Sequence, residues 1–147
     1  MVGFFILDIS LKDLKTHRIA NRTLLYFLCS RIIFSVLLPD AQMDAFAGVY
    51  FFAIFTVLYL LSKAVHKSGG IGFGDVKLIG ALAFAFFDTG LRSCEIFFIS
   101  LWLALVAHIC LHLLIYRKFP ERIAMAPDIF LASGLYLYAP IALLLPQ

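Results

Sequence analysis

The sequence of 147 residues is poor in charge, since only 14% of its residues are Asp, Glu, Lys or Arg, whereas a soluble domain carries about 25%. A chain with so few charges and 63% hydrophobic residues does not cover its apolar surface with polar groups. The low charge argues against an ordinary soluble domain. Together with a mean hydropathy of +1.01, it predicts an integral membrane protein whose surroundings are the lipid bilayer.

Three further absences exclude other classes of protein. No run of Lys and Arg with interleaved aromatic residues occurs and the net charge is only +3, so we expect no nucleic-acid partner. The cysteines Cys29, Cys94 and Cys110 form no CxxC pair, so neither a zinc site nor a disulfide framework is expected. The opening segment MVGFFILDIS lacks a basic start and a small-residue cleavage site, and we expect no cleavable signal peptide.

The sequence does contain a series of long apolar runs. A helix needs about 20 apolar residues to cross a bilayer core of about 30 Å. The runs cover approximately residues 1–11, 23–38, 44–62, 76–91, 95–116 and 123–146. Because backbone polar groups in lipid must be satisfied within the segment, these runs predict an all-α integral membrane protein. We expect a bundle of about six transmembrane helices, the first unusually short, in a single domain over residues 1–147.

Basic residues occur in alternate connections between the runs. The first, third and fifth connections contain Lys12, Lys15, Arg18, Arg22, Lys63, Lys67, Lys77, Arg117, Lys118 and Arg122. The other connections contain Asp40, Asp44, Asp88 and Glu95, with Arg92 as their only basic residue. Because basic loops of membrane proteins remain in the cytoplasm, this pattern predicts six spans with both termini outside.

Two acidic residues lie on the cytoplasmic side of the predicted bundle. Asp13 follows the first run, in DLKTHRIAN, and Asp75 precedes the fourth run, in GGIGFGDVKL. Two carboxylates close together in a poorly solvated site cannot both ionise, so one pKa rises and the pair can share a proton. Such a pair can supply the acid and the base of aspartic proteolysis. A simpler interpretation remains open, in which Asp75 only caps a helix after a flexible loop.

The segment before Asp75 is rich in glycine. Gly69, Gly70, Gly72 and Gly74 allow a positive φ and a close approach of backbone to a substrate. Asp75 also stands next to a predicted helix N-terminus. We therefore expect the positive end of the helix dipole to favour its ionised form.

Three segments, in order along the chain, resemble the motifs of the type IV prepilin peptidases, which are intramembrane aspartyl proteases of the GxGD type. Asp13 with residues 19–21 (IAN) resembles a first motif of Asp followed by Ile-Pro-Asn. Residues 72–77 (GFGDVK) match the second motif, Gly-x-Gly-Asp-x-Lys, without a change. Residues 123–127 (IAMAP) resemble a last motif that reads roughly Ile-Pro-Phe-Ala-Pro.

The resemblance implies an aspartic endopeptidase with Asp13 and Asp75 as catalytic residues and with neither cofactor nor metal. The motif residues expected to contact substrate are Asn21, Gly72, Gly74 and Lys77. The implied substrate is a prepilin or pseudopilin of a type IV pilus or protein secretion system. Its basic leader would be cut at the cytoplasmic face of a bacterial inner membrane. Without paired CxxC motifs, the chain resembles the short form that lacks the N-methylation domain.

Two alternatives remain open at the level of the sequence. Ala20 and Ala124 replace two prolines of the family motifs, which allows a catalytically inactive homologue that acts as an assembly partner in a pilus or secretion machine. A small membrane transporter subunit, in which Asp13 and Asp75 bind cations, is the other alternative. It predicts acidic residues spread through the depth of the bundle.

Further polar residues lie within the apolar runs. His108 and His112 are spaced i,i+4, as metal ligands on one helix face often are, but no third ligand follows. We interpret them as a packed histidine pair. Arg31 needs a partner inside its run, and Asp8 and Asp128 are the candidates.

Overall fold

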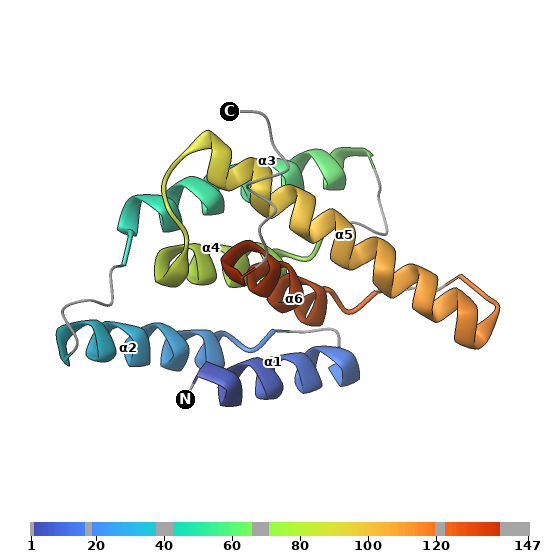
Figure 1. Ribbon diagram of the computed structural model, residues 1–147, viewed down its shortest axis with the longest axis horizontal. Coiled ribbons are helices and arrows are strands. Elements are labelled where there is room, and N and C mark those ends of the chain that lie inside the picture. Colours follow the sequence, from blue (N-terminus) through green and yellow to red (C-terminus); the bar gives the residue numbers. More distant parts are fainter. Residues whose placement is uncertain (1, 17–18, 38–42, 66–70, 120–122, 139–147) are drawn as a thin grey trace.

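The computed structural model describes residues 2–16, 19–37, 43–65, 71–119 and 123–138. These residues form six α-helices and no strand, which confirms the predicted all-helical class (Figure 1). The helices are α1 (Val2–Thr16), α2 (Asn21–Leu37), α3 (Ala45–Val65), α4 (Phe73–Phe86), α5 (Leu91–Tyr116) and α6 (Met125–Tyr138). Six residues of the sequence analysis lie outside the described ranges, namely Arg18, Asp40, Lys67, Gly69, Gly70 and Arg122.

Two of these six helices are long and apolar enough to cross a membrane, α3 with 21 residues and α5 with 26. The helix α4 has 14 residues and rises by about 21 Å, less than the roughly 30 Å of a bilayer core. The six-span arrangement therefore stays a prediction for the shorter helices.

The first helix is not unusually short, and this expectation was wrong. The helix α1 has 15 residues against 14 in α4, and it continues through Thr16. The apolar run ends at residue 11, but the Leu and Lys residues that follow are good helix formers. An ion pair of 2.6 Å between Lys12 and Asp8, one turn apart, stabilises the same stretch. Asp13 consequently lies inside α1 and not in the connection after it.

The helix α4 lies at the centre of the bundle. Its side chains are buried around most of its circumference, and it packs against α2, α3 and α6. The closest approach is to α3, where small residues leave room for the backbones. A Cβ atom added to Gly48 would lie 2.8 Å from the Cβ of Phe84, and one added to Gly80 would lie 3.1 Å from the Cβ of Phe52. Such small-residue contacts are typical of helix packing in membranes.

An aromatic cluster fixes the end of α4 that lies away from Asp75. The ring of Phe87 has its centroid 5.3 Å from that of Phe51 and 5.0 Å from that of Phe97. These rings belong to α3, α5 and the turn that follows α4, and all three are buried. Nearby, Asp44 accepts hydrogen bonds from the backbone N–H of Thr89 at 3.0 Å and from its hydroxyl at 2.7 Å. The two contacts join the start of α3 to the α4–α5 turn.

Arg31 pairs with neither of the acids expected for it. Its Nη2 donates to the carbonyl oxygen of Ala85 at 2.7 Å, and its guanidinium lies 4.5 Å from the ring centroid of Phe86. The last carbonyls of a helix have no partner within the helix, so Arg31 of α2 satisfies one of them at the end of α4.

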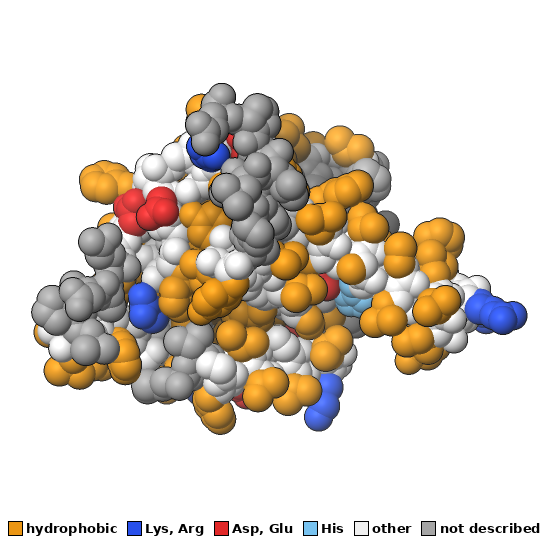
Figure 2. All heavy atoms as spheres, in the orientation of Figure 1, with side chains coloured by type: hydrophobic (Ala, Val, Ile, Leu, Met, Phe, Trp, Pro, Cys, Tyr) orange, Lys and Arg blue, Asp and Glu red, His pale blue; other side chains and the backbone are white. Residues whose placement is uncertain are grey.

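The outer surface of the described bundle is apolar. Large hydrophobic side chains are exposed on α1, α2, α3 and α5, for example Phe4, Val36, Phe46 and Leu114. Figure 2 shows such side chains spread over the face in view. Soluble monomers rarely expose apolar surface on this scale, so the distribution supports a bundle that faces lipid.

Candidate active site

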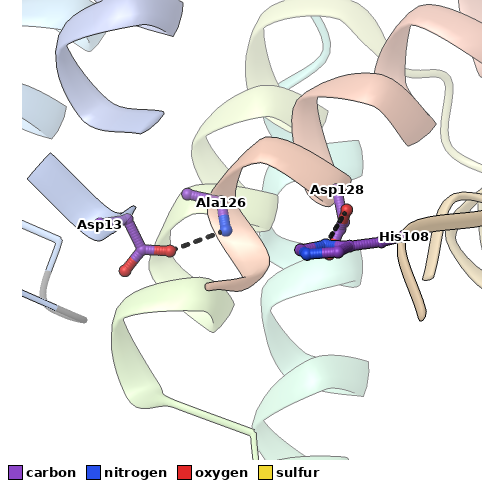
Figure 3. A network of polar contacts seen from close by, with 4 residues as sticks. All are labelled: Asp13, His108, Ala126 and Asp128. Carbon is purple, nitrogen blue, oxygen red and sulfur yellow. Dashed lines mark hydrogen bonds and ion pairs between the residues drawn. The ribbon is translucent and has the colours of Figure 1, made fainter. Parts of the chain in front are cut away.

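Asp13 lies in the last turn of α1 and is only 5% exposed. Its Oδ2 accepts a hydrogen bond of 2.9 Å from the backbone N–H of Ala126, in the first turn of α6 (Figure 3). The first N–H groups of a helix have no partner within the helix and lie at the positive end of its dipole. Asp13 therefore caps α6 from another part of the chain.

Asp75 lies in the first turn of α4 and is 9% exposed. Its Oδ2 accepts a hydrogen bond of 3.2 Å from the backbone N–H of Gly72, the N-cap residue of the helix. This is the half of a capping box in which the third helical residue reaches back to the cap. The simpler interpretation of Asp75 as a capping residue is thus correct in part, although the cap position itself is occupied by Gly72.

Burial is the largest influence on the protonation of Asp75, which precedes the predicted span of residues 76–91. It raises the pKa of the Asp75 carboxyl, and the negative charge of Asp13 raises it further, to about 6. The hydrogen bond from Gly72 opposes the shift but is the smallest of the three influences. The N–H of Gly72 at the helix end favours ionised Asp75, as expected, but desolvation outweighs this contribution. The structure places the two acids close enough for their charges to interact.

The glycines of the second motif are needed for space. None of the glycines in the described ranges has a φ in the left-handed region, so that part of the expectation was wrong for Gly72 and Gly74. A Cβ atom on Gly72 would lie 2.8 Å from Oδ2 of Asp75, and one on Gly74 would lie 3.3 Å from the Cβ of Ile19. The first glycine makes room for the carboxylate. The second lets the start of α4 pack against the segment before α2.

A hydrogen bond joins the first and second motifs. Lys77 donates from Nζ to the side-chain oxygen of Asn21 at 3.0 Å, and the same ammonium lies 4.9 Å from the ring centroid of Phe73. Lys77 and Asn21 also line one end of a groove of about 550 Å³ between α2, α3 and α4. The rest of the groove is almost wholly apolar, with Leu24 and Phe52 among its lining residues.

One contact near Asp13 was missed by the sequence analysis. His108 of α5 has its Nδ1 2.8 and 2.9 Å from the two carboxylate oxygens of Asp128 of α6, which is 4% exposed. His112 makes a different contact, from its Nδ1 to the carbonyl oxygen of Lys118 at 2.9 Å. The two histidines are therefore not a pair. Within the described ranges, no three His, Cys, Asp or Glu residues are placed to hold a metal ion.

The structure is a helical bundle with an apolar outer surface and two buried carboxylates, whose charges interact, at one end. These features define a class of membrane protein whose candidate site is a pair of acidic residues. Residues 1–115 match the family model of the type IV leader peptidases, so the chain belongs to this family and the predicted membership is confirmed. The match includes Asp13 and Asp75 and ends before α6. Among the curated proteins and the solved structures compared with the chain, none matches it.

Proposed function

We propose that the chain is an intramembrane aspartic endopeptidase. It removes the basic leader of a prepilin or pseudopilin-like substrate at the cytoplasmic boundary of a bacterial inner membrane. Membership of the leader peptidase family supports proteolysis, and the observation that carries the aspartic mechanism is the placement of the two acids. Asp13 and Asp75 are both buried, and the charge of Asp13 raises the pKa of Asp75.

The surroundings of the two acids differ in a way that assigns their roles. Burial and the charge of Asp13 favour a proton on Asp75, so Asp75 takes the role of the acid and Asp13 that of the base. In the proposed reaction, Asp13 takes a proton from water as the water oxygen attacks the scissile carbonyl carbon, and Asp75 gives its proton to the carbonyl oxygen. The C–N bond then breaks as the nitrogen receives the proton held by Asp13. The proton on the carbonyl oxygen returns to Asp75, which leaves an acid and an amine as products.

The length of α5 supports a site near the membrane boundary. From Leu91 to His108 this helix rises by about 26 Å, against a bilayer core of about 30 Å. His108 contacts the first turn of α6, which holds Asp13. If Leu91 lies at the outer face, the two acids lie within a few ångströms of the inner face. A basic leader followed by an apolar helix has its junction at that depth.

The described acids do not favour the transporter alternative. The buried ones are Asp13, Asp75 and Asp128, and these lie at the first or last turns of their helices at one end of the bundle. The replaced proline at position 20 has no visible effect on the start of α2, because the carbonyl of Ala20 accepts the N–H groups of Thr23 and Leu24.

Cleavage by the purified protein in lipid nanodiscs tests the proposal. The substrate is a precursor with a basic leader, a glycine at the boundary and an apolar helix. Asp13→Asn and Asp75→Asn should each lower kcat by about a thousandfold or more, and the double variant should be little worse than either single variant. Asn keeps an oxygen that accepts the N–H of Ala126 or Gly72, so folding should persist.

The matched control is Asp8→Asn, which changes an acid of the same helix that is paired with Lys12. It should cleave at nearly the normal rate. Normal cleavage by both Asp13→Asn and Asp75→Asn would exclude the aspartic mechanism. A folded wild-type protein that cleaves no such precursor would instead support the inactive homologue.

A further inference from the structure

The pair formed by His108 and Asp128 joins the long helix α5 to the first turn of α6. Asp128 is almost fully buried, while the side chain of His108 is 27% exposed. A buried carboxylate is strongly destabilising unless it has a hydrogen-bonded partner, and His108 is the side chain that contacts both of its oxygens. The contact therefore fixes the position of α6 relative to α5.

The same turn of α6 holds the first acid of the proposed dyad. Ala126, two residues before Asp128, donates its N–H to Asp13. In Figure 3, Asp13 and His108 approach the first turn of α6 from opposite sides. Any shift of this turn along or around the axis of α6 changes the direction of the N–H that Asp13 accepts.

The pair also affects the charge that faces Asp13. The carboxylates of Asp128 and Asp13 are close enough for their charges to interact, and the other titratable group that faces Asp128 is His108. The contact with His108 gives the Asp128 carboxylate a hydrogen-bonded partner on the side of α5.

We propose that His108 and Asp128 are positioning residues, which hold the first turn of α6 so that the N–H of Ala126 meets the carboxylate of Asp13. The inference rests on the proposed function, since it concerns how one catalytic acid is kept in place. It adds two residues that belong to none of the three motifs described for the sequence. One of them, Asp128, lies beyond the segment that matches the family model.

The central test is the double variant His108→Leu/Asp128→Leu, which removes both polar groups and leaves no buried charge without a partner. Replacing a buried pair by apolar residues is often neutral for folding. In nanodiscs, we expect normal thermal unfolding, a kcat lowered by at least about tenfold and a KM changed by less than about twofold, because neither residue lines the groove between α2, α3 and α4. Hydrogen exchange at the amide of Ala126 should become at least about tenfold faster, because the turn of α6 that carries this N–H is no longer held against Asp13.

Two further variants separate positioning from packing. The single variant His108→Asn keeps an N–H donor near the position of Nδ1. Its kcat should be well above that of the double variant and close to that of the wild-type protein. His112→Leu is the matched control, because His112 lies one turn further along α5 and contacts only the carbonyl of Lys118 among the contacts described for its ring nitrogens. It should leave kcat and the exchange of Ala126 unchanged. If the double variant does not fold, Asp128→Leu replaces it with the same expected results, since the partly exposed His108 tolerates the loss of its partner.

The outcomes are distinct. A double variant that folds, cleaves at the normal rate and keeps slow exchange at Ala126 overturns the proposal. A higher KM with unchanged kcat also overturns it, since that result indicates substrate binding. If the wild-type protein cleaves nothing but the exchange of Ala126 responds as expected, the positioning role stands and only the proposed function falls.

Discussion

The carboxyl group of Asp75 is subject to two opposing requirements at the scale of the single residue. It accepts the N–H of Gly72 and so helps to begin α4, which favours an ionised oxygen. It is also buried next to Asp13, which favours a proton, and the balance raises its pKa to about 6. A group held in this way is poorly suited to stabilising the fold at high pH and well suited to exchanging a proton near neutrality.

Asp75→Asn should therefore stabilise the folded protein at pH 8. The folded pKa of about 6 lies above the ordinary value of 3.8, so between these values the folded state keeps a proton that the unfolded state releases. Stability consequently falls as the pH rises through this window. A shift of roughly two units corresponds to at most about 3 kcal/mol at pH 8. Asn carries no charge and avoids this loss, while its oxygen still accepts the N–H of Gly72.

Thermal unfolding in nanodiscs at pH 8 and at pH 3.5 measures the effect. Asp75→Asn should unfold at a higher temperature than the wild-type protein at pH 8 and at nearly the same temperature at pH 3.5. The control is Asp88→Asn, which changes an exposed acid at the other end of α4. An Asp75→Asn variant that is less stable than wild type at pH 8 would contradict the assigned pKa.

The sequence indicated Asp13 and Asp75 as candidates, but it did not indicate which groups hold each of them. Asp13 and Asp75 were both assigned to one side of the membrane from the alternation of basic connections. The N–H that Asp13 accepts belongs to Ala126 of α6, and four helices separate α6 from α1 in the sequence, so no local pattern indicates this contact. The i,i+4 spacing of His108 and His112 suggested a mutual role, whereas packing against α6 directs only His108 toward Asp128.

At the scale of the helix, the start of α4 combines a cap, a catalytic candidate and a close helix contact within one turn. The cap residue Gly72 has an extended backbone with φ −74° and ψ 142°, which any residue can adopt. Its lack of a side chain matters because a Cβ atom would lie 2.8 Å from Oδ2 of Asp75. The sequence indicated glycine here but suggested backbone freedom as its reason, since the position of the carboxylate is a tertiary property.

Gly72→Ala should consequently impair cleavage much more than folding. The added methyl group displaces the carboxylate of Asp75, and a displacement of about 1 Å in a catalytic group can cost roughly a hundredfold in rate. The backbone itself is not strained, so the unfolding temperature should change little. Gly134→Ala is the matched control, because its added Cβ atom meets nothing within 4 Å. Equal activity of the two variants would show that the carboxylate of Asp75 is not held as described.

At the scale of the whole molecule, the two ends of the bundle differ in their chemistry. One end holds Asp13, Asp75 and Asp128 together with the Lys77–Asn21 contact. The other end holds the aromatic cluster and the contact of Asp44 with the α4–α5 turn. Lysines such as Lys77 lie at the first end, so their positive charge does not attract a basic leader. In the proposed function, apolar contacts must then recognise the substrate, and the groove between α2, α3 and α4 is an apolar surface next to this end.

The orientation of these two ends in the membrane is the prediction on which the site depends. Cysteine residues are introduced singly at Lys15, Lys118 and Arg92 in a protein whose native Cys29, Cys94 and Cys110 are replaced by Ala or Ser. A thiol reagent that does not cross membranes should label position 92 in intact cells and positions 15 and 118 only after the membrane is opened. The reason is that the basic connections remain in the cytoplasm, and α5 joins position 92 to position 118 across the bilayer. If position 15 were labelled in intact cells, Asp13 in the same turn of α1 would not lie at the cytoplasmic boundary. A leader in the cytoplasm would then not reach Asp13 and Asp75.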